Sequence, residues 1–205
     1  MVDKLRKLAS VRPDFKLILD LVPESSSLLD LGCGDGALVR LLELEKGVKS
    51  LGVEGAQDMV LEAVRNGAAV IHKDLNDGLG EFVDGSFEYV VLNHTLQAVN
   101  RPDELLNEML RVGDKGIISF VNMGYITARI QLMFGGKMPV TKTLPYTWYS
   151  TPNIHLGTIS DFKQLCDKLN INIRSQVPFG KRSSILARLF PNLFASTCVF
   201  LVSKK

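Results

Sequence analysis

Short apolar runs alternate with segments of helical periodicity over the first 120 residues of the chain. Between the runs, apolar side chains recur at the helical spacing over residues 36–47, 57–67 and 101–113. Strict alternation of strand and helix is typical of parallel strands joined by right-handed crossovers. The pattern therefore predicts an α/β, doubly wound, mostly parallel sheet with helices on both faces. Its strands are expected at residues 27–32, 48–55, 68–75, 86–94 and 116–122.

The alternation stops after residue 122. Residues 123–136 have the pattern of an amphipathic helix, and residues 137–157 contain three prolines and the only tryptophan, Trp148. Loops of this length inside a domain are uncommon and are usually functional. We therefore expect one domain over residues 1–205, with residues 123–157 as an insertion that forms a lid or a partner surface. The remaining expected elements are a helix at 158–170, strands at 171–178 and 196–204, and a basic, apolar, helix-like excursion at 181–195 that contains Lys181 and Arg182.

Composition and charge exclude several classes of protein. The 24 basic residues nearly balance the 22 acidic ones, so no nucleic-acid partner is expected. No apolar run approaches the roughly 20 residues that span a bilayer, and the N-terminus lacks a signal-peptide core. The three cysteines are widely spaced, which predicts neither disulfides nor a metal site and favours a cytoplasmic protein.

A glycine-rich turn, "DLGCGDG", follows the first predicted strand at residues 30–36. Such a turn lies at the carboxyl end of a strand, where open α/β sheets bind their ligands. Its spacing is G-x-G-x-G rather than the dinucleotide pattern G-x-G-x-x-G, and Asp30 and Asp35 place carboxylates where a pyrophosphate would lie. A cationic or zwitterionic ligand is the better match, and Asp30 would face its ammonium group.

Acidic residues also end the next two predicted strands. Glu54 is placed to accept hydrogen bonds from a ribose diol, and Asp74 from an exocyclic amine. An ammonium group, a ribose and an adenine together describe S-adenosylmethionine, or its demethylated product S-adenosylhomocysteine. Three alternatives stay open: a purely structural glycine turn, Asp74 as a helix cap, and a nicotinamide-binding module.

Catalytic side chains are sparse. His94, at the end of the fourth predicted strand, is the one candidate base for methyl transfer, and the alternative is a hydrogen-bonded histidine that lines the crevice. Cys33 lies in the glycine turn, where a helix N-terminus can lower a thiol pKa. The chain has no G-x-S-x-G nucleophile elbow, so acyl transfer by this chain itself is not expected.

Several motifs resemble a known family. "LLDLGCGDG", the acid of "GVEG", "HKDLNDGL" and "GSFEYVVLNHTLQAVNRPDELLNEMLRVG" resemble class I S-adenosylmethionine-dependent methyltransferases. "RPDF", "TLQAV" and above all "MFGGKMPVTKTLPYTWYSTPNIH" resemble the MetW family of methionine biosynthesis proteins more narrowly. The resemblance covers nearly the whole chain, and generic methyltransferases lack the last of these blocks.

The resemblance implies a Rossmann-like sheet of seven strands whose final strand is antiparallel. It also implies a partner, a MetX-type homoserine O-acyltransferase, with a homodimer or a hetero-oligomer as the assembly. The chain would then be an S-adenosylmethionine-binding activator of that enzyme, and the alternative is an active small-molecule methyltransferase. The sequence departs from the family at Gly55 and Ala56, where isoleucine and aspartate are usual, and at Asn93-His94, where Ser-Gln is frequent. The residues expected to hold the nucleoside are Asp30, Gly32, Cys33, Gly34, Gly36, Glu54, Gly55, Asp74, Leu75 and Asn93.

Overall fold

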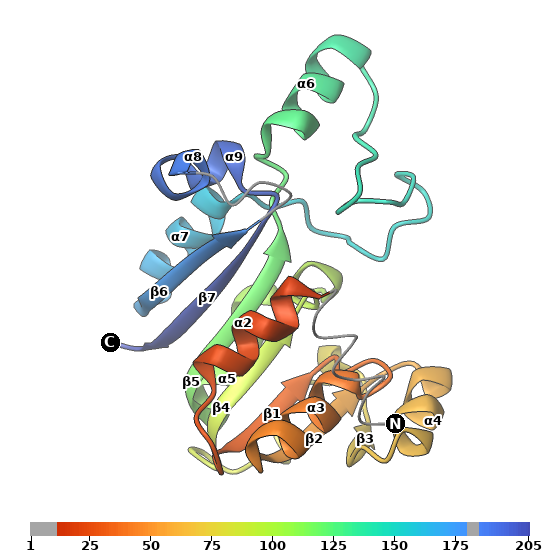
Figure 1. Cartoon of the computed structure of the whole chain (residues 1–205), viewed down its shortest axis with the longest axis vertical. Helices are drawn as coiled ribbons and strands as arrows, with labels where there is room; N and C mark the ends of the chain where they lie inside the picture. The colour runs from red at the N-terminus through yellow and green to blue at the C-terminus, as the bar shows by residue number, and fades with distance from the viewer. Residues whose placement is uncertain (1–11, 180–184) are drawn as a thin grey trace.

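The computed structural model describes residues 12–179 and 185–205 and contains one seven-stranded sheet (Figure 1). The strand order is β3-β2-β1-β4-β5-β7-β6. β7 is antiparallel to both of its neighbours, and the other pairs are parallel. This topology confirms the predicted seven-stranded α/β sheet with an antiparallel final strand. The strands are β1 (Ser27–Leu31), β2 (Lys49–Glu54), β3 (Val70–His72), β4 (Phe87–Asn93), β5 (Gly113–Val121), β6 (Ile171–Phe179) and β7 (Thr197–Lys204).

Helices cover both faces of the sheet. On one face, α2 and α3 bury Phe15, Ile18 and Leu38 against Leu28 and Val91. On the other face, a larger apolar core joins α5 and α7 to the inner strands, where Phe120, Phe162 and Phe200 pack together. The helices are α2 (Pro13–Leu21), α3 (Ala37–Lys46), α4 (Gln57–Arg65), α5 (Pro102–Val112), α6 (Ile126–Gly135), α7 (Ile159–Lys168), α8 (Ile185–Leu189) and α9 (Pro191–Phe194), with single 3₁₀ turns η1 (Leu75–Asp77) and η2 (Leu96–Ala98).

The predicted elements differ from the observed ones mainly at their ends. β3 is only three residues long, because the chain turns into η1 at Leu75. β5 starts at Gly113, directly after α5, rather than at residue 116. The excursion at 181–195 contains the short helices α8 and α9, whereas Lys181 and Arg182 lie outside the described residues, as does the N-terminal stretch 1–11.

Helix α2 was not predicted. Its signals are nonetheless in the sequence: Pro13 stands at the first helical position, Asp14 in the first turn, and Phe15, Ile18 and Val22 follow at helical spacing. The helix lies across β4 and β5 (Figure 1). Its N-terminal end therefore comes close to the carboxyl ends of the parallel strands, which places Arg12 and Asp14 beside the predicted site.

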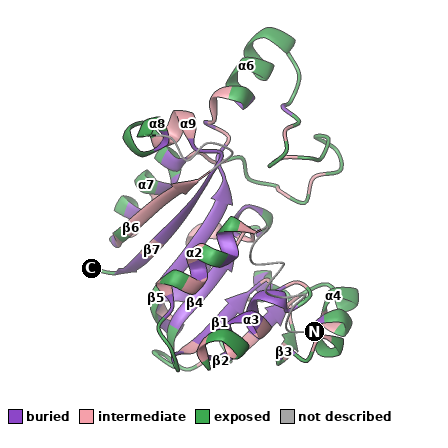
Figure 2. Ribbon diagram, in the orientation of Figure 1, coloured by how far each residue is buried: buried purple, intermediate pink, exposed green. Residues whose placement is uncertain are grey.

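Helix α6 projects away from the layered body of the molecule (Figure 1), and the segment after it returns without forming helix or strand. We call residues 126–156 the projecting segment. The sequence predicted an amphipathic helix here. Ala128 is the only buried residue of α6, and most of the helix is exposed (Figure 2). The predicted helix is therefore present, but its apolar side chains are left uncovered, because the helix extends past the end of β5 and has no sheet to pack against.

None of the helices in the described ranges is long and apolar enough to cross a bilayer.

Candidate functional site

The glycine-rich turn between β1 and α3 has the backbone shape that its sequence predicts. Gly32, Gly34 and Gly36 all adopt left-handed φ angles, of 78°, 57° and 71°. At Gly36 a side chain is excluded by contact as well, since a methyl group built there would lie 2.6 Å from the Cβ of Ala68. At Gly34 a methyl group would meet nothing within 4 Å. Gly36 is thus required by packing, whereas Gly34 leaves open space beside the backbone.

Asp30 is a buried carboxyl group in the middle of the sheet. It lies in β1 opposite Gly52 of β2 and Val91 of β4, and only 2% of its surface is exposed. Its Oδ1 has no hydrogen-bond donor among the described residues. Burial, assisted by the negative charge of Glu54, raises the pKa of Asp30 to about 7. An unpaired carboxylate in such a place attracts a cation or a strong donor.

Glu54, at the end of β2, joins the glycine-rich turn to the turn that follows β2. Its Oε2 accepts a hydrogen bond from the Gly34 amide at 2.8 Å, and its Oε1 accepts from the amides of Gly55 and Ala56, both at 2.9 Å. The structure therefore brings Glu54 and the glycine turn together, as predicted. These three bonds already use most of the carboxylate's acceptor capacity, so a ribose diol would have to share or replace them.

Asp74 acts as a cap in this structure. Its Oδ1 accepts from the backbone amide of Asn76 at 2.9 Å and from the Asn76 side chain at 2.8 Å, which starts η1. The structure thus shows Asp74 as the N-cap of η1, which was one of the open alternatives. Asp74 is exposed, and Leu75 next to it is buried in the larger core. Both follow β3, the edge strand, one strand further out than Glu54.

Asn93 lies on the same sheet face as Asp30, since it is two residues beyond Val91 in β4. Its amide nitrogen donates to Asp14 Oδ2 at 3.1 Å, and its carbonyl oxygen accepts from the Ser119 hydroxyl. His94 follows in the left-handed region at φ 62°, with its Nε2 3.8 Å from Asp14 Oδ2. Burial lowers the pKa of His94 despite the opposing charge of Asp14, which favours the neutral ring of a base.

Asp14 and Arg12 are site residues that the sequence reasoning missed. Asp14 is 4% exposed, and Arg12 Nη2 donates to its Oδ2 at 2.6 Å. Burial alone would raise the pKa of Asp14, but bonds from Arg12 and Asn93 hold that pKa below its usual value. Only tertiary folding brings the "RPDF" motif to the end of β4. The sequence signal that could have identified Asp14 is an acid that directly follows a proline at the start of an apolar run with helical spacing.

Cys33 is not an activated thiol. It is buried beneath the glycine turn, and burial together with the charges of Asp30 and Glu54 raises its pKa well above the usual range. A helix N-terminus can lower a thiol pKa, but here burial and the two carboxylates raise it, so Cys33 serves as a buried residue of the turn. Among the described residues no group of histidines, cysteines and acids has the arrangement of a metal site.

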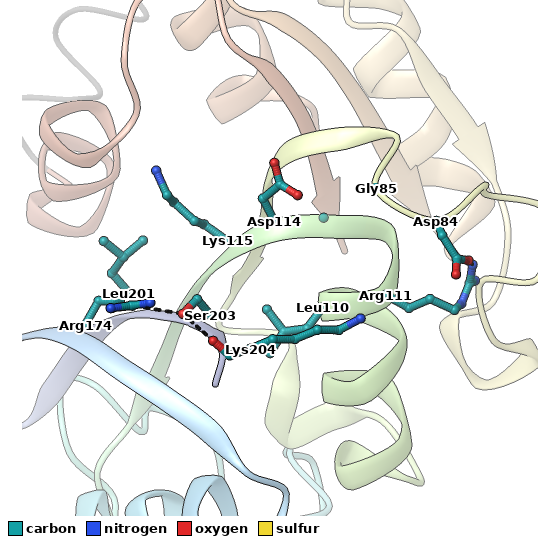
Figure 3. A pocket seen from close by; sticks show the side chains of 11 residues that line it. Asp84, Gly85, Leu110, Arg111, Asp114, Lys115, Arg174, Leu201, Ser203 and Lys204 are labelled. Atoms are coloured by element: carbon teal, nitrogen blue, oxygen red, sulfur yellow. Dashed lines mark hydrogen bonds and ion pairs between the residues drawn. The ribbon is translucent and has the colours of Figure 1, made fainter.

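A cavity of about 610 Å³ lies at the other edge of the sheet, beside the start of β5 and the end of β7 (Figure 3). Arg111 bonds Asp84, Glu108 and two backbone carbonyls there, and Arg174 Nε donates to Ser203 Oγ at 2.9 Å. None of the residues expected to hold the nucleoside lines this cavity. The candidate site is therefore the carboxyl edge formed by Asp30, Glu54 and Asn93.

The chain matches a known family. Residues 12–202 match the family described as "Methionine biosynthesis protein MetW". A curated relative, the bifunctional methionine biosynthesis protein MetXA/MetW of Rhodopirellula baltica, is 40% identical over 197 residues. The match covers 91% of this chain and 32% of the relative, so the chain spans about a third of that protein's length.

Solved structures show the same fold at low identity. An S-adenosylmethionine-dependent methyltransferase of Thermotoga maritima superposes with a TM-score of 0.66 at 18% identity, covering 100% of this chain and 91% of that one. Magnesium protoporphyrin IX methyltransferase of Synechocystis, solved with bound S-adenosylhomocysteine, gives 0.65 at 17% identity, covering 98% and 84%. The fold is thus that of class I methyltransferases. With the family match over residues 12–202, the chain belongs to the MetW family of methionine biosynthesis proteins.

Proposed function

We propose that the carboxyl edge of the sheet binds S-adenosylmethionine or S-adenosylhomocysteine. The observation that carries this proposal is Asp30, a buried carboxyl group whose Oδ1 has no donor among the described residues. The ligand's ammonium group would supply the missing donor. The sulfonium of S-adenosylmethionine adds a second positive charge close to two carboxylates, whereas a diphosphate would be repelled. When bound, this nucleoside supplies either a methyl group or a signal of methionine supply.

Each part of such a ligand would contact a different group of site residues. Asp30 and the turn of Gly32, Cys33, Gly34 and Gly36 would hold the amino-acid end. Glu54, with Gly55 beside it, would hold the ribose hydroxyls, and Asn93 would form the floor. Asp74 and Leu75 would hold the adenine, with the exposed carboxylate of Asp74 accepting from its amine.

The role proposed for the nucleoside complex is to activate a MetX-type homoserine O-acyltransferase. The curated relative supports this partner, because MetXA and MetW form one chain there. The chain's own buried thiols have raised pKa values, so the acyl transfer itself is assigned to the partner.

The first test measures the partner reaction. The chain is mixed with the MetX-type acyltransferase of its own organism, homoserine and an acyl-CoA, and the release of CoA is followed with and without S-adenosylmethionine. The proposal expects a several-fold increase in rate when the chain is added. Equal rates at saturating chain concentrations would refute the activator role.

The second test measures the nucleoside by calorimetry. Gly34→Ala adds a methyl group in the open space at the turn, and we expect it to weaken binding at least tenfold. Gly85→Ala is the matched control: its φ is 63°, and its methyl group also meets nothing within 4 Å. Both variants carry the same backbone strain, so equal nucleoside affinity in the two would contradict the assigned site.

A second candidate function is methyl transfer to a small molecule. The observation that favours it is His94, an imidazole with a lowered pKa at a left-handed φ beside Asp14. In that role His94 would accept a proton from the acceptor, and Asp14 would orient its ring. S-Adenosylhomocysteine formation from a metabolite mixture, lost in His94→Gln, together with an unchanged acyltransferase rate, would favour this function over the first.

A further inference from the structure

The projecting segment, residues 126–156, exposes large apolar side chains that the fold leaves uncovered (Figure 2). Four of them are more than 70% exposed: Met133, Phe134, Trp148 and Tyr149. Of the 21 exposed large apolar residues in the described part of the chain, 11 lie in this segment. An exposed cluster of aromatic and methionine side chains is typical of the centre of a protein interface.

Helix α6 has few means to stay folded alone. It is ten residues long, and isolated helices of that length are marginal in water. Within the segment, the Gln131 side chain exchanges two hydrogen bonds with the backbone of Val140. Beyond Ala128, no residue of the helix is buried. The segment therefore has an apolar surface whose burial would stabilise it.

The base of the segment is nevertheless firmly held. The amides of Ile154 and His155 both donate to the carbonyl oxygen of Gln97 in η2, at 2.9 and 3.0 Å. Met123 and Gly157 flank the two ends of the segment, and the Met123 amide donates to the carbonyl oxygen of Gly157 at 3.1 Å. The fold thus presents the surface from a fixed position rather than at the end of a loose tail.

The charge of this surface has a single sign. No aspartate or glutamate occurs between Asp114 and Asp161, whereas Arg129, Lys137 and Lys142 lie in the segment and are exposed. A second copy of the same surface would bring like charges together. Three cations fall short of the four to eight expected for binding an anionic membrane. The complementary occupant is a protein surface with an apolar centre and acidic residues around it.

We propose that the projecting segment is the docking surface for the acyltransferase, which contributes an apolar patch with an acidic rim. This inference rests on the proposed function, and it names where that partner binds. Trp148 and Tyr149, whose rings meet edge to face at 5.6 Å, are the central anchors. Trp148 also packs around a shallow hollow that Met138 and Leu144 line, so the anchors lie on an apolar surface.

The test measures binding of the full chain to the acyltransferase by calorimetry. We expect Phe134→Ala combined with Trp148→Ala to raise the dissociation constant at least tenfold. The control is Leu61→Ala combined with Val83→Ala, also exposed apolar residues, and we expect a change of less than twofold. Lys137→Glu with Lys142→Glu should weaken binding at least fivefold and reduce its salt dependence, whereas Lys16→Glu with Lys49→Glu should not. Hydrogen exchange should show protection of residues 126–156 when the partner is added.

Each other outcome has a defined meaning. If the wild type binds and stimulates the acyltransferase but the segment variants do so equally, the docking surface is elsewhere and the proposed function stands. If the wild type neither binds nor changes CoA release, both proposals fail. If sedimentation shows a dimer of the chain that the Phe134/Trp148 variant abolishes without affecting partner binding, the occupant is a second copy. Loss of binding to vesicles of one quarter phosphatidylglycerol, with partner binding intact, would assign the surface to membranes instead.

Discussion

Asp30, a proposed binding residue, lowers the stability of the fold when its carboxyl group is ionised. Its carboxyl group is buried, and its pKa is raised from 3.8 to about 7 in the folded chain. The folded state therefore binds the proton more tightly than the unfolded state does. Stability linked to this proton is present below pH 4 and is lost as the pH rises through 7. A ligand that pairs with the carboxylate would reverse that loss.

Replacing Asp30 by asparagine should remove this dependence on pH. Between pH 5 and pH 8 the wild-type group should lower the free energy of unfolding by about 2–3 kcal/mol, and Asp30→Asn should not show that part of the decrease. Urea unfolding at the two pH values measures it. The same variant should bind S-adenosylmethionine at least tenfold more weakly, because the amide carries no charge. Parallel pH profiles in wild type and variant would show that Asp30 does not titrate in this range.

Among the elements, α7 is the one whose start the sequence predicts most directly. The Thr158 hydroxyl accepts from the Asp161 amide at 3.2 Å, and Asp161 Oδ2 accepts from the Thr158 amide at 2.9 Å. This reciprocal pair is a capping box, and it satisfies two amides that the helix cannot pair. The predicted helix at 158–170 thus begins with a threonine cap, and the structure adds the reciprocal bond of the acid three residues later.

The capping box can be tested without touching the candidate site. Thr158→Ala should lower the free energy of unfolding by about 1 kcal/mol, because the first turn loses its side-chain acceptor. Ser160→Ala, an exposed change one position inside the same helix, is the control and should alter stability by less than half as much. Equal losses in the two variants would mean that the cap contributes nothing beyond helix propensity.

In the molecule as a whole, Gln97 joins the body to the projecting segment. Its side-chain oxygen accepts from the buried Val121 amide at 3.2 Å, and its side-chain nitrogen donates to the carbonyl of His155 at 3.1 Å. Gln97 lies three residues beyond His94, and Thr95 between them packs so closely on Gly32 that a side chain there would collide with it. The turn η2 thus touches the glycine turn at one end and the projecting segment at the other.

Gln97→Leu should weaken binding of the acyltransferase to the projecting segment without affecting nucleoside binding at the carboxyl edge. We expect the acyltransferase to bind at least fivefold more weakly, because the return of the projecting segment loses a bond at its base. Nucleoside affinity should change less than twofold, since Asp30 and Glu54 keep their surroundings. Stability should fall by about 1–3 kcal/mol, because the Val121 amide is left unpaired. Gln164→Leu, an exposed change on α7, is the control. If the Gln97→Leu and Gln164→Leu variants bind the partner equally well, Gln97 is not needed to hold the segment.

The alternation of strands and helices, the glycine turn and the acids near the ends of β1 and β2 followed from the sequence alone, whereas the order of the strands in the sheet came from the structure. These features depend on contacts between near neighbours in the chain: apolar periodicity, turn residues and caps act within a few residues of one another. The capping role of Asp74 was likewise local, and it stood among the alternatives from the start. The sequence therefore determined the fold class and the position of the candidate site along the chain.

Only the tertiary structure decided which of these groups are buried and which are paired. Glu54 bonds three backbone amides, Asp30 is left with an unpaired oxygen, and Asp14 reaches Asn93 across 79 positions of sequence. Helix α6 has an amphipathic pattern but nothing to pack against, because β5 ends before it begins. The physical reason is the same in each case: burial and pairing depend on the summed packing of distant segments, which no local pattern contains.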